Sequence, residues 1–578
     1  MTHAATLAAL YSKYIIFGNH AASDYFPVIK SLVRLRNETA LEVEKQFWQR
    51  AIDTVYSLIA DELVTNLGSP VNPVSFGTSG WRGIIGKDFF VKSVTQVTRA
   101  IIALYDELAV NSELAGALGV ANRAEARRRG CVLGYDNRFG GRLLADHVSD
   151  TLTAHGFSVY FAGESSTGVL SAAVLELQAA FSINLTPSHN PLEYAGFKFN
   201  AADAGPAAQI ITDRITRKAR EIMTLDQPYA VQPKPKLRKT INSLDLWIDL
   251  VRRNQDDHGL DHIEIIERFA GDKDICVAID CVHGVSRVHI QSLFYNTATD
   301  RLLLFRNTAD CTFGGVSPEP SSANLKLVKA ALAARPEPLK LGMILDPDAD
   351  RIRFMDEGGE ISMNQFGAMA YHFLHEIRQK NGMVAKTVAT SNFANALAKA
   401  FGEEIFEPRV GFKEFKPVIN RALVCFEESD GITVIGHTPE KDAYIGLLLA
   451  LDMVMTLRKN LTEYLAELSE KYGHYYPDRD GVSVSRQGAE LHKALAGLDR
   501  YSVGSIVQVG GIPKTIVDLI TIDGRKMILD DGSWIMIRPS GTEPKVRFYV
   551  EARNDADRKT LLAAARAMLQ EVGLLADS

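Results

Sequence analysis

Three aspartates at alternate positions are the strongest chemical signal in the sequence. Asp346, Asp348 and Asp350 lie in LGMILDPDADR (341–351), directly after an apolar run that predicts a buried strand. Ionised carboxylates this close together repel one another unless a cation lies between them. The pattern therefore indicates a site for a hard divalent metal such as Mg²⁺.

The same spacing also begins a calcium-binding loop of the helix-loop-helix type, in which Glu357 would take the twelfth position. Two features argue against that type of loop. Arg351 stands at the sixth position, where the tight turn requires glycine, and the preceding element is a strand. A plain exposed acidic turn is the other alternative. We interpret the segment as a magnesium loop in which Arg351 reaches a phosphate oxygen.

A serine in a stiffened turn is the second signal. In SINLTPSHNP (182–191) a predicted buried strand runs into a turn whose two prolines limit the conformations open to Ser188. A rigidly presented hydroxyl suits a nucleophile or a phosphate carrier. His189 is a candidate for proton transfer, and Lys198 is a candidate for a phosphate contact. The alternative is a helix cap or an ordinary turn.

A third strand leads into a carboxylate-rich loop, ALVCFEESDG (422–431). Glu427 and Ser429 lie two positions apart, so both can face the same way and accept hydrogen bonds from paired hydroxyls of a sugar. Lys441, in the following GHTPEKDA (436–443), is a candidate cation, with a solvated surface lysine as the alternative.

Two further loops combine hydroxyls, an arginine and glycine. A glycine permits close backbone approach, and an arginine with hydroxyls beside it forms a cradle for phosphate. Plain polar turns are the alternative for both loops. The candidate residues are Thr78, Ser79 and Arg82 in FGTSGWRG (76–83), and Arg538, Ser540, Gly541 and Thr542 in RPSGTEP (538–544).

The elements that must position these loops alternate along the chain. Apolar, β-branched runs are separated by helical stretches, which favours α/β layers. Residues 38–67 carry apolar positions at helical spacing and predict an amphipathic helix ahead of all the chemistry. A length of 578 residues suggests about four domains. Breaks are expected at the proline-rich segment 226–240, at DEGGE (356–360) and at 470–481.

Composition narrows the function classes. Hydrophobic residues make up 46% and charged residues 23%, as in ordinary globular proteins, and the net charge of −6 offers no basic field for nucleic acid. Five cysteines without a CxxC pair argue against a disulfide scaffold. The most apolar run, residues 444–457, is short and contains Asp452, so we expect a cytoplasmic protein with no membrane span.

Together these loops resemble those of the α-D-phosphohexomutase family, which includes phosphoglucomutases and phosphomannomutases. TPSHNP resembles the family's phosphoserine loop, DPDADR its magnesium loop, EES with a following glycine its sugar loop, and RPSGTEP its phosphate loop. They occur in the family's order, and the resemblance covers roughly residues 72–553. The departures are Phe426 and Asp430 around the sugar loop, Pro347 in the metal loop, and an N-terminal extension outside the family pattern.

The resemblance implies an α/β architecture of three related domains with mixed sheets and a smaller C-terminal α+β domain around a central cleft. The expected parts are an N-terminal helical extension (1–70), domain I with the phosphoserine loop (71–238), domain II with the metal loop (239–357), domain III with the sugar loop (358–470) and domain IV with the phosphate loop (471–578).

For the site, the resemblance implies that Ser188 carries the phosphate and that Mg²⁺ binds Asp346, Asp348, Asp350 and the modified Ser188. It also places Lys413, in VGFKEF, in the cleft. The candidates for catalysis are then Ser188, His189, Lys198, Arg351 and Lys441. Of these, His189, Lys198 and Lys441 are the candidates for the base that accepts the hydroxyl proton.

The expected activity is an isomerase, an intramolecular phosphotransferase. It would interconvert glucose 1-phosphate and glucose 6-phosphate through glucose 1,6-bisphosphate, which would also act as activator. The partner is a small hexose phosphate, and no protein partner is implied. The alternatives are a mutase for mannose, glucosamine or pentose phosphates, and a non-catalytic protein that binds phosphosugars.

Overall fold

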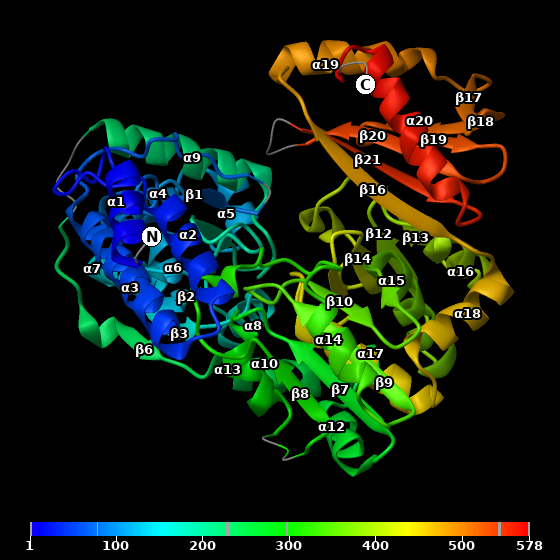
Figure 1. Cartoon of the computed structure of the whole chain (residues 1–578), viewed down its shortest axis with the longest axis horizontal. Coiled ribbons are helices and arrows are strands. Elements are labelled where there is room, and N and C mark those ends of the chain that lie inside the picture. The colour runs from blue at the N-terminus through cyan, green and yellow to red at the C-terminus, as the bar shows by residue number, and fades with distance from the viewer. Residues whose placement is uncertain are drawn as a thin grey trace.

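Four β-sheets follow one another along the chain, each with helices packed against it (Figure 1). The structure, a computed structural model, describes residues 3–77, 79–225, 230–295, 297, 299–540 and 545–575. The first three sheets are mixed and the last is antiparallel throughout. This confirms the predicted class of three related α/β domains followed by a smaller α+β domain.

The sheet of domain I has six strands in the order β1-β5-β4-β2-β3-β6. Its central strand β2 is buried along its whole length because every residue of CVLGY is apolar or small enough to pack between two helix layers. The strands are β1 (Trp81–Ile84), β2 (Cys131–Tyr135), β3 (Val159–Glu164), β4 (Phe181–Leu185), β5 (Tyr194–Asn200) and β6 (Arg238–Thr240). The helices are α4 (Val91–Leu104), α5 (Ser112–Leu118), α6 (Arg123–Arg129), α7 (Gly141–Ala154), α8 (Thr167–Leu177) and α9 (Gln209–Thr224).

Domains II and III share one large apolar core. The second sheet has the order β11-β10-β9-β7-β8 and the third β13-β12-β14-β15. Their strands are β7 (Ile275–Asp280), β8 (Leu302–Phe305), β9 (Leu339–Leu345), β10 (Ile352–Met355), β11 (Glu360–Ile361), β12 (Met383–Lys386), β13 (Ile405–Phe406), β14 (Ala422–Glu427) and β15 (Gly431–Val434). Their helices are α10 (Ser243–Arg253), α11 (Gln255–His258), α12 (His262–Gly271), α13 (Ser286–Leu293), α14 (Lys326–Ala333), α15 (Met363–His372), α16 (Phe393–Phe401), α17 (Ala443–Leu457) and α18 (Leu461–Tyr472).

Domain IV is a six-stranded antiparallel sheet in the order β16-β21-β20-β19-β18-β17, with its own core. Figure 1 shows it beyond domain III, at the end of the molecule away from the N-terminal helices. Its elements are β16 (Tyr476–Ser483), α19 (Gly488–Ala496), β17 (Ile506–Val509), β18 (Ile512–Ile520), β19 (Arg525–Leu529), β20 (Trp534–Pro539), β21 (Lys545–Ala552) and α20 (Asp557–Glu571).

One local arrangement recurs in the first three domains and positions the chemistry. A buried strand that pairs in parallel with its neighbour is followed by a short loop and an antiparallel strand: β4 to β5, β9 to β10, and β14 to β15. Each loop contains one residue other than glycine with positive φ, namely Ser188 (56°), Ala349 (48°) and Asp430 (72°). The chain therefore reverses sharply at the same point of each sheet.

The predicted helix over 38–67 is confirmed as α3 (Glu42–Thr65), and α1 (His3–Tyr14) and α2 (Tyr25–Glu38) precede it. The apolar faces of α2 and α3 belong to the same core as domain I. The predicted end of domain I at residue 238 is the first residue of β6, so the first sheet continues to residue 240. The predicted end of domain II at residue 357 lies between β10 and β11, so the second sheet continues to residue 361.

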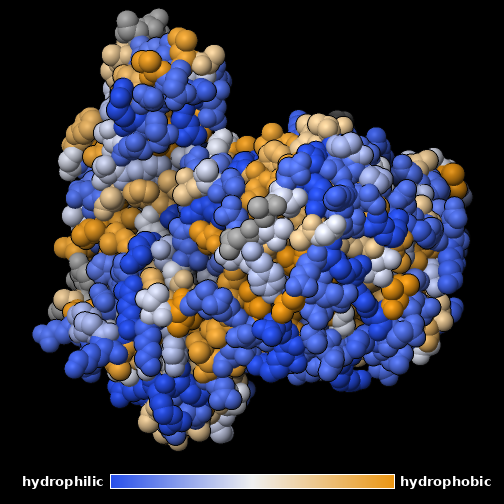
Figure 2. Space-filling model, turned by 90° about the horizontal axis from the view of Figure 1, so that it is seen from below, coloured by the Kyte–Doolittle hydropathy of each residue, from blue (hydrophilic) through white to orange (hydrophobic). Residues whose placement is uncertain are grey.

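Over the described ranges, every helix is too short or too polar to cross a membrane. The most apolar one, α17, is buried in the core of domains II and III, and its Asp452 is paired with Arg378 at 2.5 Å. Hydrophilic residues cover most of the face shown in Figure 2, with hydrophobic ones scattered between them.

The unusual Phe426 is accommodated by a glycine on the facing helix. Phe426 is fully buried, and a Cβ at Gly367 in α15 would lie 2.2 Å from its ring. The large side chain before the sugar loop thus occupies the core rather than the cleft, because Gly367 leaves room for it.

We predict that Gly367→Ala destabilises the protein by about 1–3 kcal/mol, because the added methyl group overpacks the Phe426 ring. The midpoint of thermal or urea unfolding measures the effect. The matched control is Gly116→Ala in α5, where a Cβ meets no atom of the described residues within 4 Å. This control should be neutral or stabilising by up to about 1 kcal/mol. Equal stability of the two variants would contradict the proposed fit.

Candidate active site

A polar cleft of about 830 Å³ opens between the four domains, and each domain contributes charged side chains to its walls. Ser188, Asp346 and Asp348 are buried next to these walls. Thr78, Gly541 and Thr542 fall outside the described residues. The cleft is lined by most of the other predicted site residues: Ser79, Arg82, His189, Lys198, Asp350, Arg351, Lys413, Glu427, Ser429, Lys441, Arg538 and Ser540.

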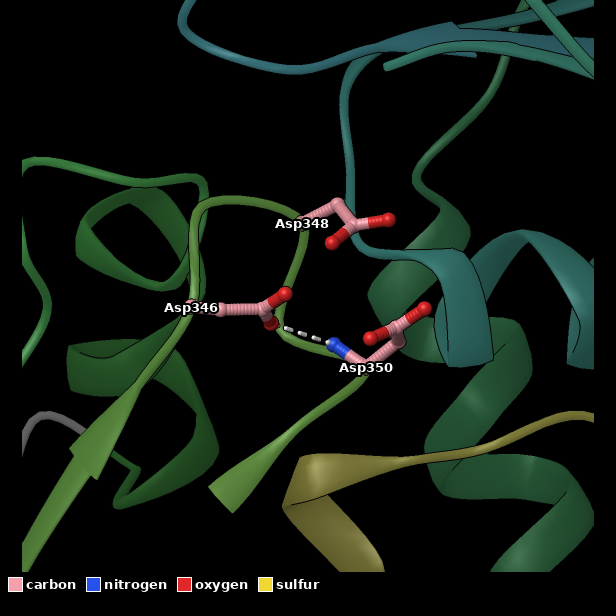
Figure 3. A group of neighbouring side chains, drawn as sticks. All are labelled: Asp346, Asp348 and Asp350. Atoms are coloured by element: carbon pink, nitrogen blue, oxygen red, sulfur yellow. Dashed lines mark hydrogen bonds between the residues drawn. The ribbon is translucent and has the colours of Figure 1, made fainter. Parts of the chain in front are cut away.

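The three aspartates of the β9–β10 loop point toward one another (Figure 3), with one carboxylate oxygen of each inside a group that spans no more than 4.8 Å. The loop holds itself in shape, because the backbone amides of Asp350 and Arg351 donate to Asp346 Oδ1 at 3.0 and 3.1 Å. Glu357 instead pairs with Lys340 at 2.5 Å. This pairing removes it from the aspartates, which contradicts the calcium-loop alternative.

Lysines from two other domains offset part of this negative charge. Lys198 Nζ donates to Asp348 Oδ2 at 2.6 Å and to Asp350 Oδ2 at 2.8 Å, and Lys441 Nζ lies 3.4 Å from Asp350. Burial opposes the charge on Lys198, but the two carboxylates raise its pKa above the usual value. Burial raises the pKa of Asp346 well above its usual value, and Asp348 and Asp350 add to the effect.

The donor set fits a magnesium ion. Two buried oxygens, Asp348 Oδ1 and Asp350 Oδ1, accept no hydrogen bond from any described residue. A buried carboxylate oxygen without a donor is costly unless a cation binds it. Three carboxylates within one loop supply the hard oxygen ligands that Mg²⁺ prefers.

Ser188 faces this group directly. Its hydroxyl donates to Asp346 Oδ2 at 2.7 Å and lies 3.2 Å from His189 Nδ1. The side chain is almost fully buried, and the backbone φ of 56° is rare for a residue with a Cβ. Such strain persists only where the surroundings hold the residue in place. The loop thus presents one fixed hydroxyl to the aspartates.

Residues that the sequence analysis did not select hold Ser188 in this position. Arg138 donates to the carbonyl oxygens of Ser188 and Pro191, both at 2.6 Å. The backbone amide of Ser188 donates to Thr186 Oγ1, and Thr186 donates to Asp136 Oδ2 at 2.7 Å. Burial raises the pKa of Asp136 to about 6. The only sequence signal for Asp136 and Arg138 is their position directly after the buried strand β2.

His189 and Arg82 lie beside the serine at the cleft. Arg82 Nη1 donates to Asn190 Oδ1 at 2.7 Å, which holds the guanidinium next to the loop that contains Ser188. The Arg351 charge, burial and the Arg82 charge lower the pKa of His189 well below its usual value.

Thr167 is a further residue that the sequence analysis missed. It begins α8, and its hydroxyl donates to Asp348 Oδ2 at 2.7 Å while its amide donates to Asp348 O at 2.9 Å. These bonds join domain I to the metal loop of domain II. The pattern SST before an apolar helical stretch is a helix-start signal, but it does not reveal the distant aspartate.

The loop between β14 and β15 presents Glu427 and Ser429 to the cleft, and the two side chains are hydrogen-bonded to each other. Ser429 Oγ donates to Glu427 Oε1 at 2.6 Å, and Lys441 Nζ lies 3.7 Å from the same carboxylate oxygen. Asp430, one of the unusual neighbours, forms an ion pair with Arg353 at 2.8 Å. The Asp430 carboxylate therefore pairs with Arg353 and takes no part in the hydrogen bond between Glu427 and Ser429.

Domain IV supplies the positive wall of the cleft. Arg538 Nε lies 3.1 Å from Asp523 Oδ2, and the same carboxylate oxygen accepts the amide of Val410 at 3.0 Å. Asp523 therefore links the arginine of domain IV to a loop of domain III. Lys413, in domain III, contacts Gln209 Oε1 of domain I at 3.2 Å. Four described cleft residues of this wall were not predicted: Arg479, Lys545, Arg547 and Tyr549.

Sequence comparison identifies four segments of one family. The models that match are described as phosphoglucomutase/phosphomannomutase domain I (residues 73–226), domain II (260–359), domain III (362–472) and the C-terminal domain (484–568). Together they cover most of the chain, and the helices α1 to α3 lie before the first match.

Individual relatives agree with the family models. The chain is 25% identical over 513 residues to a phosphoglucomutase/phosphomannomutase of Thermococcus kodakarensis, covering 86% of this chain and 98% of the relative. It is 26% identical over 490 residues to a probable phosphoglucosamine mutase of Methanosarcina barkeri, covering 83% and 96%.

A solved structure with a similar fold is that of a putative phosphomannomutase from Thermus thermophilus. It has a TM-score of 0.68 and 24% identity, and the match covers 86% of this chain and 99% of that structure. With its four domains in order and the loops of the cleft in place, the chain belongs to the α-D-phosphohexomutase family of phosphoglucomutases and phosphomannomutases.

Proposed function

We propose that this protein interconverts glucose 1-phosphate and glucose 6-phosphate by way of a phosphorylated Ser188. One observation carries the proposal: the Ser188 hydroxyl is fixed 2.7 Å from Asp346, beside three clustered carboxylates in a cleft with an arginine on its far wall. Members of the family are isomerases that move a phosphoryl group, and relatives of this chain carry the names of glucose, mannose and glucosamine phosphate mutases.

The reaction begins with the phosphoryl group on Ser188. The bond between phosphorus and Ser188 Oγ breaks as a bond forms to the free hydroxyl oxygen of the sugar phosphate. The proton of that hydroxyl leaves to a nearby base, and Ser188 Oγ takes up a proton in exchange. The product is a sugar bisphosphate, which turns over in the cleft and returns its other phosphoryl group to Ser188. Serine and the sugar exchange one phosphoryl group in each step, so no other co-reactant is needed.

The charged groups of the cleft stabilise this transfer. Mg²⁺ bound to Asp346, Asp348 and Asp350 would supply positive charge to the transferring group. Arg351 lines the cleft 3.6 Å from Asp350 and is placed to offset charge on the phosphate oxygens. Arg538 and Ser540, on the opposite wall, are suited to hold the phosphate that does not react.

Glu427 and Ser429 are suited to recognise hydroxyls that the sugar presents in both of its binding orientations. Their mutual hydrogen bond of 2.6 Å prearranges the two oxygens. A prearranged pair loses little conformational freedom on binding, so its contacts contribute more to affinity. Glucose 1,6-bisphosphate is the activator proposed for this cycle, since it would phosphorylate Ser188 directly.

A coupled assay of glucose 1-phosphate turnover with Mg²⁺ and a trace of glucose 1,6-bisphosphate tests the proposal. We expect turnover to glucose 6-phosphate. Binding of the sugar phosphate without turnover under these conditions would favour the non-catalytic alternative.

We predict that Ser188→Ala abolishes turnover and leaves the fold intact, because the change removes one hydroxyl and no core volume. Peptide mass analysis of the wild-type protein should find a phosphate on Ser188. Ser182→Ala, in the preceding strand, is the matched control and should remain active. A Ser188 peptide that stays unmodified after incubation with glucose 1,6-bisphosphate would rule out the proposed carrier.

We predict that Asp348→Asn shifts the magnesium requirement to far higher concentration or abolishes activity, because one of three negative ligands is lost. A titration of activity against Mg²⁺ measures the change. Glu357→Gln serves as the control, since Glu357 pairs with Lys340 and should leave the titration unaltered. A normal magnesium titration for Asp348→Asn would instead show that the three aspartates form an acidic turn without a metal.

We predict a preference for glucose 1-phosphate over mannose 1-phosphate of about two- to tenfold in kcat/KM. The two sugars differ at the C2 hydroxyl, and one neutral hydrogen bond contributes about 0.5–1.5 kcal/mol. Measuring kcat/KM for both, with glucosamine and pentose 1-phosphates beside them, tests the choice of sugar. Equal or higher efficiency with mannose 1-phosphate would make phosphomannomutase the better description.

A further inference from the structure

The N-terminal helices precede the segments that match the family, yet they touch the loop that carries Ser188. Helix α2 reaches this loop through Lys30, whose Nζ pairs with Glu193 Oε1 at 2.6 Å. Glu193 follows the Ser188 turn, and its carbonyl oxygen accepts the amide of Ile85 at 2.9 Å. The first half of α2 is thus linked to domain I beside the turn, through an ion pair whose lysine is half exposed.

The other end of α2 is fixed to domain II, at the segment 310–315. Asn37 Nδ2 donates to Gly314 O at 2.8 Å, and Arg36 Nη2 lies 3.6 Å from Asp310 Oδ2. Val33 packs so closely on Gly315 that a Cβ there would lie 2.8 Å from it. The helix therefore bridges two domains whose loops meet at the site.

The segment 310–315 has a conformation that needs support. Phe313, Gly314 and Gly315 have consecutive positive φ values of 53°, 63° and 81°. Such a run is unfavourable for phenylalanine, so contacts around it must hold it. Asp310 Oδ1 accepts the amide of Thr312 at 2.8 Å, and the Phe313 ring is fully buried in the core shared by α2, α3 and domain I.

Phe313 in turn lies on the residue that holds the serine. The Arg138 guanidinium sits over the Phe313 ring, 4.6 Å from its centre. The same guanidinium donates to the carbonyl oxygens of Ser188 and Pro191. The residue that follows Arg138 is also held by the N-terminal helices, because Tyr56 of α3 stacks on Phe139 with ring centres 4.3 Å apart. Phe313 thus contacts the Arg138 guanidinium directly, and Tyr56 of α3 contacts the adjacent residue.

We propose that helix α2 is a positioning brace for the phosphoserine loop. It acts through segment 310–315, Phe313 and Arg138, and it keeps the Ser188 hydroxyl directed at the aspartates of domain II. The inference rests on the proposed function, because it assigns to these helices the alignment of the serine that carries the phosphoryl group. Phe313 and Arg138 are positioning residues, since neither lines the cleft among the described residues.

Point variants test the brace in the full-length protein, because α2 and α3 form part of the core and their removal would expose it. Phe313→Leu keeps an apolar side chain and removes the ring under Arg138. Arg36→Ala combined with Asn37→Ala releases α2 from segment 310–315. Arg34→Ala is the matched control on the same helix, where Arg34 pairs only loosely with Glu38 at 3.8 Å and both are exposed.

Misalignment of a reacting group costs about tenfold or more in rate, so we expect Phe313→Leu and the double variant to lower kcat by about tenfold while KM stays within about twofold. Hydrogen exchange of the backbone amides in 186–193 should become faster in both. Arg34→Ala should match the wild type in every measurement. Thermal unfolding of each variant checks that the fold is retained.

The outcomes separate this inference from the proposed function. Wild-type kcat and wild-type amide exchange in Phe313→Leu and in the double variant would overturn the brace while the mutase reaction stands. A rise in KM with unchanged kcat would overturn it too, because it would assign these residues to substrate binding. A wild-type protein that neither turns over sugar phosphate nor carries phosphate on Ser188 would overturn the proposed function itself, and the catalytic role of the brace with it.

Discussion

The burial of three aspartates in one short loop is the constraint on which the rest of the site depends. Carboxylates removed from water repel one another and lose solvation, so they require positive charge and hydrogen-bond donors close by. Domain I provides Lys198 and the hydroxyls of Thr167 and Ser188, and domain III provides Lys441. The same contacts that compensate the aspartates therefore hold three domains together around the cleft, and they direct Ser188 at the group that is suited to bind magnesium.

A repeated strand–loop–strand unit makes this convergence possible. In each of the first three domains, a buried strand ends in a tight reversal that returns as an antiparallel strand, and the reversal carries polar side chains out of the core. Because the strand is fixed by its apolar neighbours, the loop residues have little freedom. Domain IV uses its own pair of strands, β20 and β21, to bring Arg538 to the opposite wall.

Two unusual residues of this chain, Phe426 and Asp430, each have a partner elsewhere in it. Phe426 fills the space beside Gly367, and Asp430 forms an ion pair with Arg353. Both side chains are therefore engaged away from Glu427 and Ser429, which line the cleft. The N-terminal helices likewise complete the core of domain I and contact a strained segment of domain II. These residues that depart from the family pattern therefore pack around the site and do not displace the polar side chains that line it.

The sequence alone determined the local features: the buried strands, the four-domain α/β class, and the loops with Asp346, Ser188, Glu427 and Arg538 at their ends. Each of these depends on residues close together in the chain, whose apolar pattern and spacing are visible in the sequence. Tertiary structure alone decided that Arg138 holds the Ser188 loop, that Lys198 contacts Asp348 and Asp350, and that Asp523 joins Arg538 to domain III. These partners are far apart in the chain, and a lone arginine or lysine has the same local pattern whether it is solvated or buried against a carboxylate. Only the packing of one domain on another selects between those two environments.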